Sequence, residues 1–230
     1  MPDPLEGDHA LLMRAALPIC DRYGLVLAGG YAIRAHGLVS RPSDDLDFAT
    51  ASAAPVEEIA AALAHAYRQS GLQARVVSAE GRKGHLTVAL PTGAAYRIDI
   101  LKEPLNHPAA LMSFGPVLSL EDAVALKVGA LHDRGLPRDV IDVHGATAYF
   151  SNAELVTLGR KALDEDFYLE DLRDQLDHAA AYSDEEFEAY GCRAEQIVVL
   201  KSWAQEWADQ IGRELAEMDS WTGETEEPVD

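Results

Sequence analysis

The feature that most constrains this chain is a run in which acidic and large apolar residues alternate, Asp45-Leu46-Asp47-Phe48. Successive side chains of a β-strand point to opposite faces, so a strand over 45–49 places the two aspartates on one face and the two apolar residues on the other. A rise of about 3.3 Å per residue puts the origins of the two carboxylates roughly 6.6 Å apart. The run therefore predicts a strand with one face in a core and an acidic face toward a small site.

Two carboxylates on one face repel each other, and one is driven toward protonation unless a cation lies between them. Hard oxygen ligands suit Mg²⁺ or Mn²⁺, so Asp45 and Asp47 are candidate ligands of a divalent metal ion. The alternative is structural: Asp44 and Asp45 cap a turn, and Asp47 meets an arginine such as Arg41. A lone Asp-x-Asp pattern is short and frequent, and taken alone it favours that alternative.

Two glycines, Gly29 and Gly30, follow a short apolar run at 25–28 and precede a helical pattern at 31–36. Backbone N–H groups in such a strand-to-helix turn can approach a phosphate. A pair of glycines after a strand is more often only a turn, so this signal is weak by itself.

A third carboxylate, Asp99, lies in the alternating run Tyr96-Arg97-Ile98-Asp99. Asp99 and Arg97 share one face of a predicted strand, and the apolar residues share the other. Asp99 either completes the acidic site from a neighbouring strand or forms a surface ion pair with Arg97, and the run does not separate these two possibilities.

Further along the chain, Lys127 is the only charged residue between residues 123 and 131 and lies at or beside an apolar helical stripe. Such a lysine either extends to solvent, which is the commoner case, or meets an anion in a cleft. Asp139 and Asp142 are three residues apart and share one helix face. Acidic residues in the first turn of a helix also favour its dipole without any chemistry.

The periodicity organises the chain in two parts. Helices are expected at 8–22 and 56–69, and strands at 25–28, 45–49, 73–78, 85–90 and 95–101. Pro91-Thr92-Gly93 predicts that the last two strands form a hairpin. After residue 120 the pattern is helical throughout, with capping boxes expected at Ser151…Glu154 and Ser183…Glu186.

The net charge is −20, from 19 basic and 39 acidic residues. It is uneven, because residues 1–145 carry 13 basic and 17 acidic side chains and residues 146–230 carry 6 and 22. Such a surface disfavours broad nucleic-acid binding and favours a cationic or neutral partner. A solvated acidic helical face that keeps the protein in solution is the simpler explanation of the charge after residue 146.

The remaining sequence signals concern location. The first twenty residues lack a basic region followed by a long apolar run, so no targeting segment is expected. The longest uncharged run, 104–120, contains two further prolines and is too short to span a bilayer, so no membrane partner is expected. The two cysteines are far apart without metal-type spacing, which suits a reducing cytoplasm.

The order of these motifs resembles the nucleotidyltransferases of the DNA polymerase β superfamily, and within it the AbiEii/AbiGii toxin group, which includes the MenT toxins. The motifs that carry this resemblance are Gly29-Gly30, Arg41-x-Ser43-x-Asp45-Leu46-Asp47-Phe48, Asp99, Lys127 and Arg138-Asp139-x-x-Asp142. The resemblance covers about residues 24–145, and the stretch from Arg41 to Phe48 is its most specific part. Many superfamily members have Gly-Ser where this chain has Gly29-Gly30, so a hydroxyl contact to phosphate is absent here.

The resemblance implies an α+β fold with a nucleotidyltransferase-like mixed sheet, flanking helices and an all-helical C-terminal region. The expected domains are a core at 1–119, a helical region at 120–219 that closes the cleft, and a flexible acidic tail at 220–230.

By the same resemblance, each candidate residue receives an expected role. Asp45 and Asp47, with Asp99 as a third carboxylate, hold the metal ion. Lys127 and Asp139 are catalytic or contact the nucleotide. The residues expected against the nucleotide or bracing its site are Gly29, Gly30, Arg41, Ser43 and Asp142.

The resemblance also implies a reaction: transfer of a nucleoside monophosphate from an NTP to an acceptor hydroxyl, with release of pyrophosphate and dependence on Mg²⁺ or Mn²⁺. The acceptor expected for a toxin of this group is tRNA, with an antitoxin protein as a possible partner. The acidic balance argues against tRNA, although the nearly neutral region 1–145 can still present a local basic patch from Arg34, Arg82, Lys83 and Arg134. The alternatives are a small-molecule nucleotidyltransferase that modifies a cationic antibiotic, and a non-catalytic relative that binds proteins.

Overall fold

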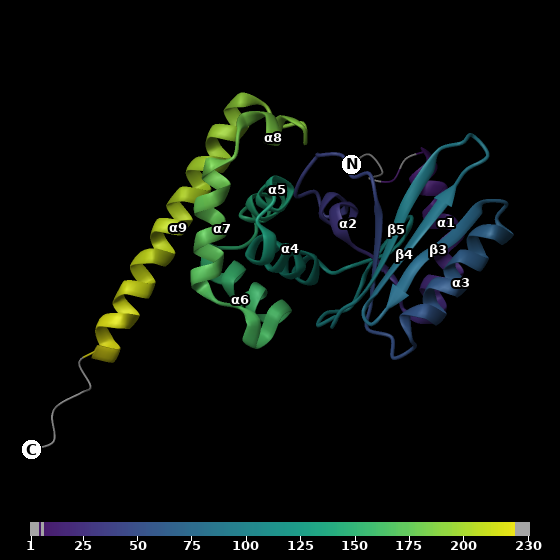
Figure 1. The fold of residues 1–230 in the computed structure, drawn as a ribbon, viewed down its shortest axis with the longest axis horizontal. Coiled ribbons are helices and arrows are strands. Elements are labelled where there is room, and N and C mark those ends of the chain that lie inside the picture. Colours follow the sequence, from purple (N-terminus) through teal and green to yellow (C-terminus); the bar gives the residue numbers. More distant parts are fainter. Residues whose placement is uncertain (1–4, 6, 224–230) are drawn as a thin grey trace, which may run out of the picture. The chain divides into compact units, whose positions relative to one another are not determined.

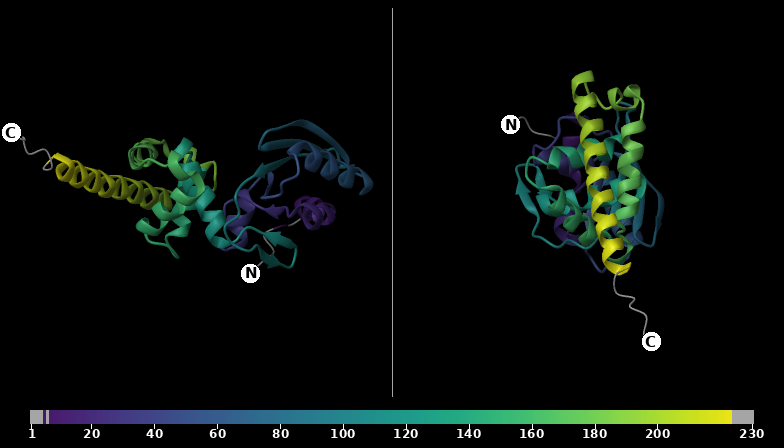
Figure 2. Two further views of the ribbon diagram at one scale, coloured as in Figure 1. Left: turned by 90° about the horizontal axis from the view of Figure 1, so that it is seen from below. Right: turned by 90° about the vertical axis from the view of Figure 1, so that its left-hand side faces the viewer.

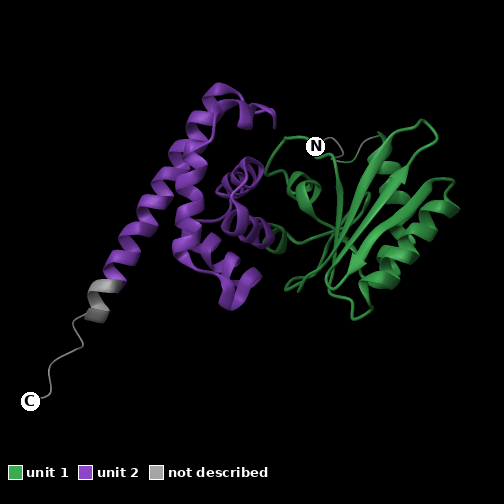
Figure 3. Cartoon of the chain, in the orientation of Figure 1, with its two compact units in different colours: residues 1–123 green, residues 124–230 purple. Residues whose placement is uncertain are grey.

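The computed structural model describes residue 5 and residues 7–223, and side chains as far as residue 218 (Figure 1). The chain divides into two compact units, residues 1–123 and 124–230, which Figure 3 colours separately. The division falls inside one helix, α4 (Leu120–Arg134), which the sequence pattern assigns wholly to the second domain.

Unit 1 is built on a mixed seven-stranded sheet with the order β3-β4-β5-β2-β1-β7-β6. Its strands are β1 (Val26–Leu27), β2 (Leu46–Thr50), β3 (Gln73–Glu80), β4 (Lys83–Ala89), β5 (Ala95–Lys102), β6 (Ala110–Met112) and β7 (Gly115–Val117). The pairs β2–β5 and β1–β7 are parallel, and the other pairs are antiparallel. This mixed sheet with its helices confirms the predicted α+β class.

One face of the sheet is the core of unit 1. The apolar residues that alternate along β2, β4 and β5 are all fully or almost fully buried there: Leu46, Phe48, Leu86, Val88, Ile98 and Ile100. Helices α1 (Gly7–Tyr23) and α3 (Val56–Gln69) lie together on one side of β3 and β4 in Figure 1, and α3 packs against β3, β4 and β5. The alternating charged residues are thereby left on the opposite, open face.

Helix α3 shows why the sequence folds this way locally. One face of it carries apolar residues at helical spacing, and all of these are completely buried: Val56, Ile59, Ala60, Leu63, Ala64 and Tyr67. Glu57 and Glu58 lie in its first turn and Arg68 in its last, which suits the helix dipole. The chain leaves the helix through Gly71, whose φ of +81° favours glycine.

Unit 2 is helical, as predicted. After α4 it contains α5 (Pro137–Ala146), α6 (Asn152–Leu163), a 3₁₀ turn (Asp164–Asp166), α7 (Leu169–Ala181), α8 (Asp184–Glu188) and α9 (Ala194–Gly223). Helices α7 and α9 pack side by side, as the right view of Figure 2 shows. The predicted capping box at Ser151 is present, because its hydroxyl accepts from the Glu154 N–H and Glu154 accepts from the Ser151 N–H.

One face of α9 is apolar and packs on its neighbours in unit 2. Leu200, Trp207 and Ile211 are almost fully buried, and Trp203 contacts the His144 ring with centroids 5.1 Å apart. Helix α9 continues to Gly223, past the start of the tail expected at 220, and residues 224–230 of that tail lie outside the described residues. Within the part of the chain that the structure describes, no helix combines the length and apolar character needed to cross a membrane.

Candidate active site

The pairing register of the strands determines which acidic residues of unit 1 lie close together. Asp47 lies in β2, and its direct partner across the parallel pair with β5 is Asp99. Asp45 lies in a bend directly before β2, which begins at Leu46 and not at residue 45 as predicted, and its charge acts on Arg97 of β5 together with the charges of Asp47 and Asp99. The structure therefore brings Asp45, Asp47 and Asp99 to adjacent positions on the open face, with Asp99 on a neighbouring strand as the sequence pattern suggests.

Gly29 opens α2 (Gly29–Ala35) directly beside this face. Its φ of +59° lies in the left-handed region, and a Cβ atom built on it would collide with the Asp47 carboxylate. Ala28 N–H donates to the Asp47 carbonyl at 2.8 Å, which fixes the turn against β2. Glycine is thus required here both by the backbone conformation and by the close approach of an acidic side chain.

Gly30 and the loop before β2 lie equally close. A Cβ on Gly30 would lie 2.7 Å from Ser43 Oγ and 3.2 Å from Arg41 Nη2. The Arg41 side chain is buried, with 8% of the residue exposed, and its Nη1 donates to the Pro42 carbonyl at 3.1 Å. The residues expected around the triphosphate are therefore neighbours in unit 1.

Asp99 has two nitrogen partners in this structure, one on Arg97 and one on His85. Arg97 Nε donates to Asp99 Oδ1 at 2.9 Å, and His85 Nδ1 lies 2.6 Å from the same oxygen. The hydrogen bond and charge of Asp99, together with the charges of Asp45 and Asp47, raise the pKa of Arg97. The surface ion pair considered for Asp99 and Arg97 is therefore present, and the Arg97 guanidinium lies within the field of all three carboxylates.

The donor set fits a hard divalent cation. Among residue 5 and residues 7–218, no three His, Cys, Asp or Glu side chains gather closely enough to hold a metal ion. Mg²⁺, however, is commonly bound by one or two carboxylates, with water and substrate phosphate as its other ligands. Asp45 and Asp47 supply two such carboxylates, and Gly29 leaves the space beside Asp47 without a Cβ atom.

A second cluster of charged residues lies in unit 2, between α4 and α5. Lys127 Nζ is 2.9 Å from Asp142 Oδ2 and 3.9 Å from Asp139 Oδ1. Both aspartates have no exposed surface, and 11% of the Lys127 side chain is exposed. The lysine thus meets buried anions rather than extending into solvent.

Arg134 completes this second cluster. Its Nε and Nη2 donate to the two carboxylate oxygens of Asp139 at 2.8 and 3.0 Å, a bidentate arrangement. The structure brings Lys127, Asp139 and Asp142 together within unit 2, and it brings the glycines and the β2 carboxylates together within unit 1. Two arginines of the expected basic patch are engaged locally, Arg134 with Asp139 and Arg82 with Glu103 at 2.6 Å.

The sequence pattern did not single out His85. Its place beside Asp99 follows from the register of the β4–β5 hairpin, in which His85 and Asp99 are direct partners. Counting outward in pairs from the predicted turn at 91–93 gives the same pairing, so the signal was present in the sequence.

Comparison with known proteins identifies the family of this chain. Residues 12–222 match the family described as the nucleotidyl transferase AbiEii toxin of a type IV toxin–antitoxin system. No curated protein matches the chain.

Two solved structures share the fold. MenT4, a nucleotidyltransferase toxin from Mycobacterium tuberculosis, has a TM-score of 0.58 at 20% identity, covering 88% of this chain and 82% of that one. JHP933 from Helicobacter pylori has a TM-score of 0.54 at 18% identity, covering 95% and 100%. Because the family match spans nearly all of the sequence, the chain belongs to the AbiEii nucleotidyltransferase toxin family.

Proposed function

We propose that this protein transfers a nucleoside monophosphate from an NTP to a hydroxyl of tRNA, with release of pyrophosphate. The observation that carries the proposal is the open face of β2 and β5, where Asp45 and Asp47 adjoin Asp99 and where the Asp47 carboxylate packs directly on the backbone of the Gly29 turn. In this reaction the acceptor oxygen forms a bond to the α-phosphorus as the bond to pyrophosphate breaks. The proton of the acceptor hydroxyl passes to a carboxylate of this face, for which Asp99 is the candidate.

The metal ligands in this proposal are Asp45 and Asp47, with Asp99 as a third carboxylate. When bound there, Mg²⁺ or Mn²⁺ lowers the pKa of the attacking hydroxyl and neutralises charge on the leaving oxygens. Asp99 also contacts Arg97 and His85 through the same oxygen, and the charges of Asp45 and Asp47 act on Arg97.

The triphosphate is proposed to lie against Gly29, Gly30 and Ser43. Support comes from the absence of side chains on the two glycines and from the Ser43 hydroxyl next to them. Arg41 braces this turn, because its buried guanidinium lies beside Gly30 and donates a hydrogen bond to the carbonyl of Pro42.

Lys127 and Asp139 are proposed to act on the nucleotide, and Asp142 to brace Lys127. Their support is a buried cluster in which Asp142 lies 2.9 Å from Lys127 and Arg134 binds Asp139 through both oxygens. Burying paired charges costs desolvation free energy, which only close geometry and further hydrogen bonds repay. Such a cluster is therefore weak evidence for a purely stabilising role.

Partners follow from the family. A toxin of a type IV toxin–antitoxin system is proposed to act with an antitoxin protein encoded alongside it. The charge of −20 favours one second candidate, a nucleotidyltransferase whose acceptor is a cationic small molecule such as an aminoglycoside.

The test is incubation of the purified protein with each α-labelled NTP, Mg²⁺, and either total tRNA or a panel of aminoglycosides. Label in RNA supports the proposal, label in a drug supports the second candidate, and label in neither contradicts both. Asp45→Asn and Asp47→Asn should each lose transfer activity while remaining folded. Excess EDTA, which removes the divalent metal, should likewise abolish transfer by the wild type without unfolding it.

The matched control is Asp44→Asn, which neutralises the exposed aspartate next to Asp45. Asp44→Asn should keep normal turnover. Normal turnover in both Asp45→Asn and Asp47→Asn would sink the mechanism.

A further inference from the structure

The open face of β3, β4 and β5 carries a row of polar side chains that the proposed chemistry does not use. Arg75 of β3 is the direct partner of Thr87 of β4, and Thr87 is the direct partner of Arg97 of β5. Directly opposite residues in a sheet share a face, so the three side chains lie side by side. The two arginines are two strands apart, or about 10 Å between backbones, a span that their long side chains can close around one anion.

This row lies next to the row that contains the carboxylates. Ser78, His85, Asp99 and Asp47 are successive partners across β3, β4, β5 and β2. On β4 and β5 the two rows are two residues apart, which is about 6.8 Å along the strands. A group bound in the arginine row therefore lies close to the carboxylates at which the transfer is proposed to occur.

The donors of this row are available. Arg75 is exposed and makes no hydrogen bond or ion pair to any residue that the structure describes, and the same holds for the half-buried Thr87 hydroxyl. Arg97 is anchored through Nε to Asp99 and through Nη2 to His85 Nδ1 at 3.2 Å, while 55% of its side chain stays exposed. Two guanidinium groups and a hydroxyl in one row form an arrangement suited to a phosphate.

The position of the row in the sheet separates it from the triphosphate. In the strand order β2 lies between β5 and β1, and the glycine turn follows β1. The glycines and the arginine row therefore lie on opposite sides of the β2 carboxylates. Phosphoryl transfer needs the attacking and leaving oxygens roughly in line, so a ligand on the arginine side is the acceptor rather than the leaving pyrophosphate.

We propose that Arg75, Thr87 and Arg97 bind the phosphate adjacent to the reacting hydroxyl of a polynucleotide acceptor. The inference rests on the proposed function and adds a binding site for the acceptor. A chain with a net charge of −20 repels phosphate backbones at long range, so an RNA acceptor has to be held by local cations of this kind. The same row repels a cationic drug.

The experiment measures steady-state transfer from labelled NTP to a synthetic RNA that carries the acceptor end of tRNA. The full-length wild type is compared with Arg75→Ala and Arg75→Lys. The control is Arg14→Ala, which removes another exposed arginine, on α1. Arg75→Ala should raise the KM for RNA about tenfold, as expected for one exposed contact to a charged group, and leave the KM for NTP nearly unchanged.

Two further readouts identify the phosphate itself. The slope of log Kd for RNA against log salt should fall by about 0.7 in Arg75→Ala, the value for one phosphate contact on a single strand. Replacing the last internucleotide phosphate by an uncharged methylphosphonate should weaken RNA binding by wild type and by Arg14→Ala, and have little effect on Arg75→Ala. Arg75→Lys should keep part of the affinity.

The outcomes separate this inference from the proposed function. A wild type that labels no RNA overturns both. A wild type that labels RNA while Arg75→Ala keeps the KM of Arg14→Ala overturns the acceptor site alone. A raised KM for NTP without a change for RNA assigns the row to the triphosphate and also overturns it.

Discussion

Lys127 lies between two carboxylates that water does not reach. Its ammonium group is 2.9 Å from Asp142 and 3.9 Å from Asp139, and both aspartates are completely buried. Removing one partner of a buried ion pair typically costs about 3–5 kcal/mol. We expect Lys127→Met to lower the free energy of unfolding by roughly that amount in urea denaturation.

The double variant Lys127→Met/Asp142→Leu is the control, because it removes the carboxylate that pairs with Lys127 as well. It should regain a large part of the lost stability but no transfer activity. If it is no more stable than Lys127→Met, burial of Asp142 is not the cause of the loss.

The buried thiol of Cys20 makes the free energy of unfolding depend on pH in the alkaline range. Burial, and secondarily the charge of Asp21, raise the pKa of its thiol from 9.0 to about 12. The unfolded chain therefore releases this proton first, so the stabilisation is complete below pH 9 and is lost as the pH rises toward the folded pKa. We expect the free energy of unfolding to fall between pH 9 and about 11, and less steeply in Cys20→Ala.

Urea midpoints measured at steps of pH check this expectation for Cys20. The small cavity in Cys20→Ala lowers stability similarly at every pH, so only the slopes are compared. Equal slopes in wild type and variant would contradict the assignment.

At the scale of elements, the turn from β1 into α2 depends on Gly29 for two reasons, its backbone conformation and its contact with Asp47. Gly81 shares only the first and so separates the two effects. Gly29 and Gly81 share a φ of +59°, but a Cβ on Gly29 would meet the Asp47 carboxylate and one on Gly81 would meet nothing within 4 Å. Gly81→Ala should therefore cost only the backbone strain, about 1–2 kcal/mol, and keep full transfer activity. Gly29→Ala should add the displacement of Asp47 and lose transfer.

Thermal unfolding and NTP turnover of the Gly29 and Gly81 variants, measured together, check this prediction. Equal turnover in Gly29→Ala and Gly81→Ala would show that the position of Asp47 does not depend on the turn.

Periodicity predicted the elements that are long enough to show it. The helix at 56–69 was predicted with its observed ends, and the strands of the β4–β5 hairpin were predicted to within two residues. The β6–β7 hairpin was missed, because each strand has three residues and β7 includes Pro116. Three residues cannot display a period of two, and proline is uncommon inside strands.

The same limit applies to the candidate site. Alternation predicted that Asp45 and Asp47 share one face, but β2 begins at Leu46, so the rule applies to Asp47 and not to Asp45. The pairing of Lys127 with Asp142 joins two helices, and helical spacing gives the face of each residue but not its partner on another element. The engagement of Asp139 by Arg134 was missed for the same reason.

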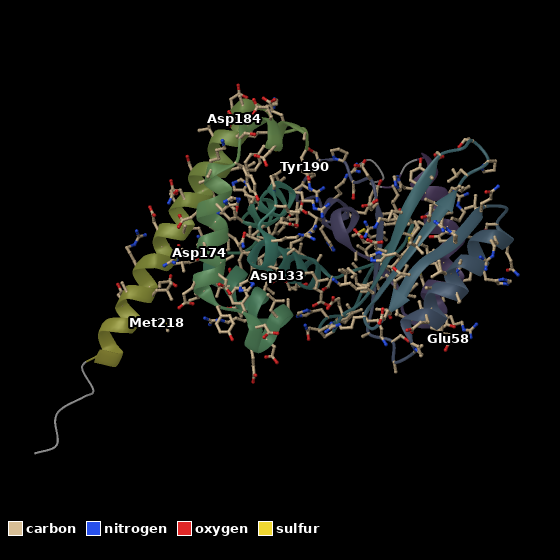
Figure 4. All side chains as sticks on the ribbon, viewed as in Figure 1. Glu58, Asp133, Asp174, Asp184, Tyr190 and Met218 are labelled. Atoms are coloured by element: carbon tan, nitrogen blue, oxygen red, sulfur yellow. The ribbon has the colours of Figure 1, made fainter. Side chains whose placement is uncertain are left out.

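At the scale of the whole molecule, the excess of acidic residues lies mainly on exposed helix faces of unit 2. Figure 4 shows Asp174 on α7 and Asp184 on α8, both exposed. Some of these residues have local partners, since Arg173 pairs with Asp174 at 2.7 Å and Lys201 with Asp184 at 2.6 Å. Six basic residues cannot pair with the 22 acidic ones of residues 146–230, so most of this charge faces other negative charge or solvent.

This imbalance predicts that salt stabilises the protein. Raising the ionic strength from about 0.01 to 0.15 M shortens the Debye length from about 30 to about 8 Å and screens the repulsion between acidic side chains. Surface ion pairs weaken at the same time, but each is worth at most about 1 kcal/mol and they are outnumbered. We expect Tm in calorimetry to rise by roughly 2–4 °C, the shift that about 1 kcal/mol produces in a chain of this size. Choline chloride should act as well as potassium chloride if screening is the cause, and a Tm that falls with either salt would mean that the ion pairs outweigh the repulsion.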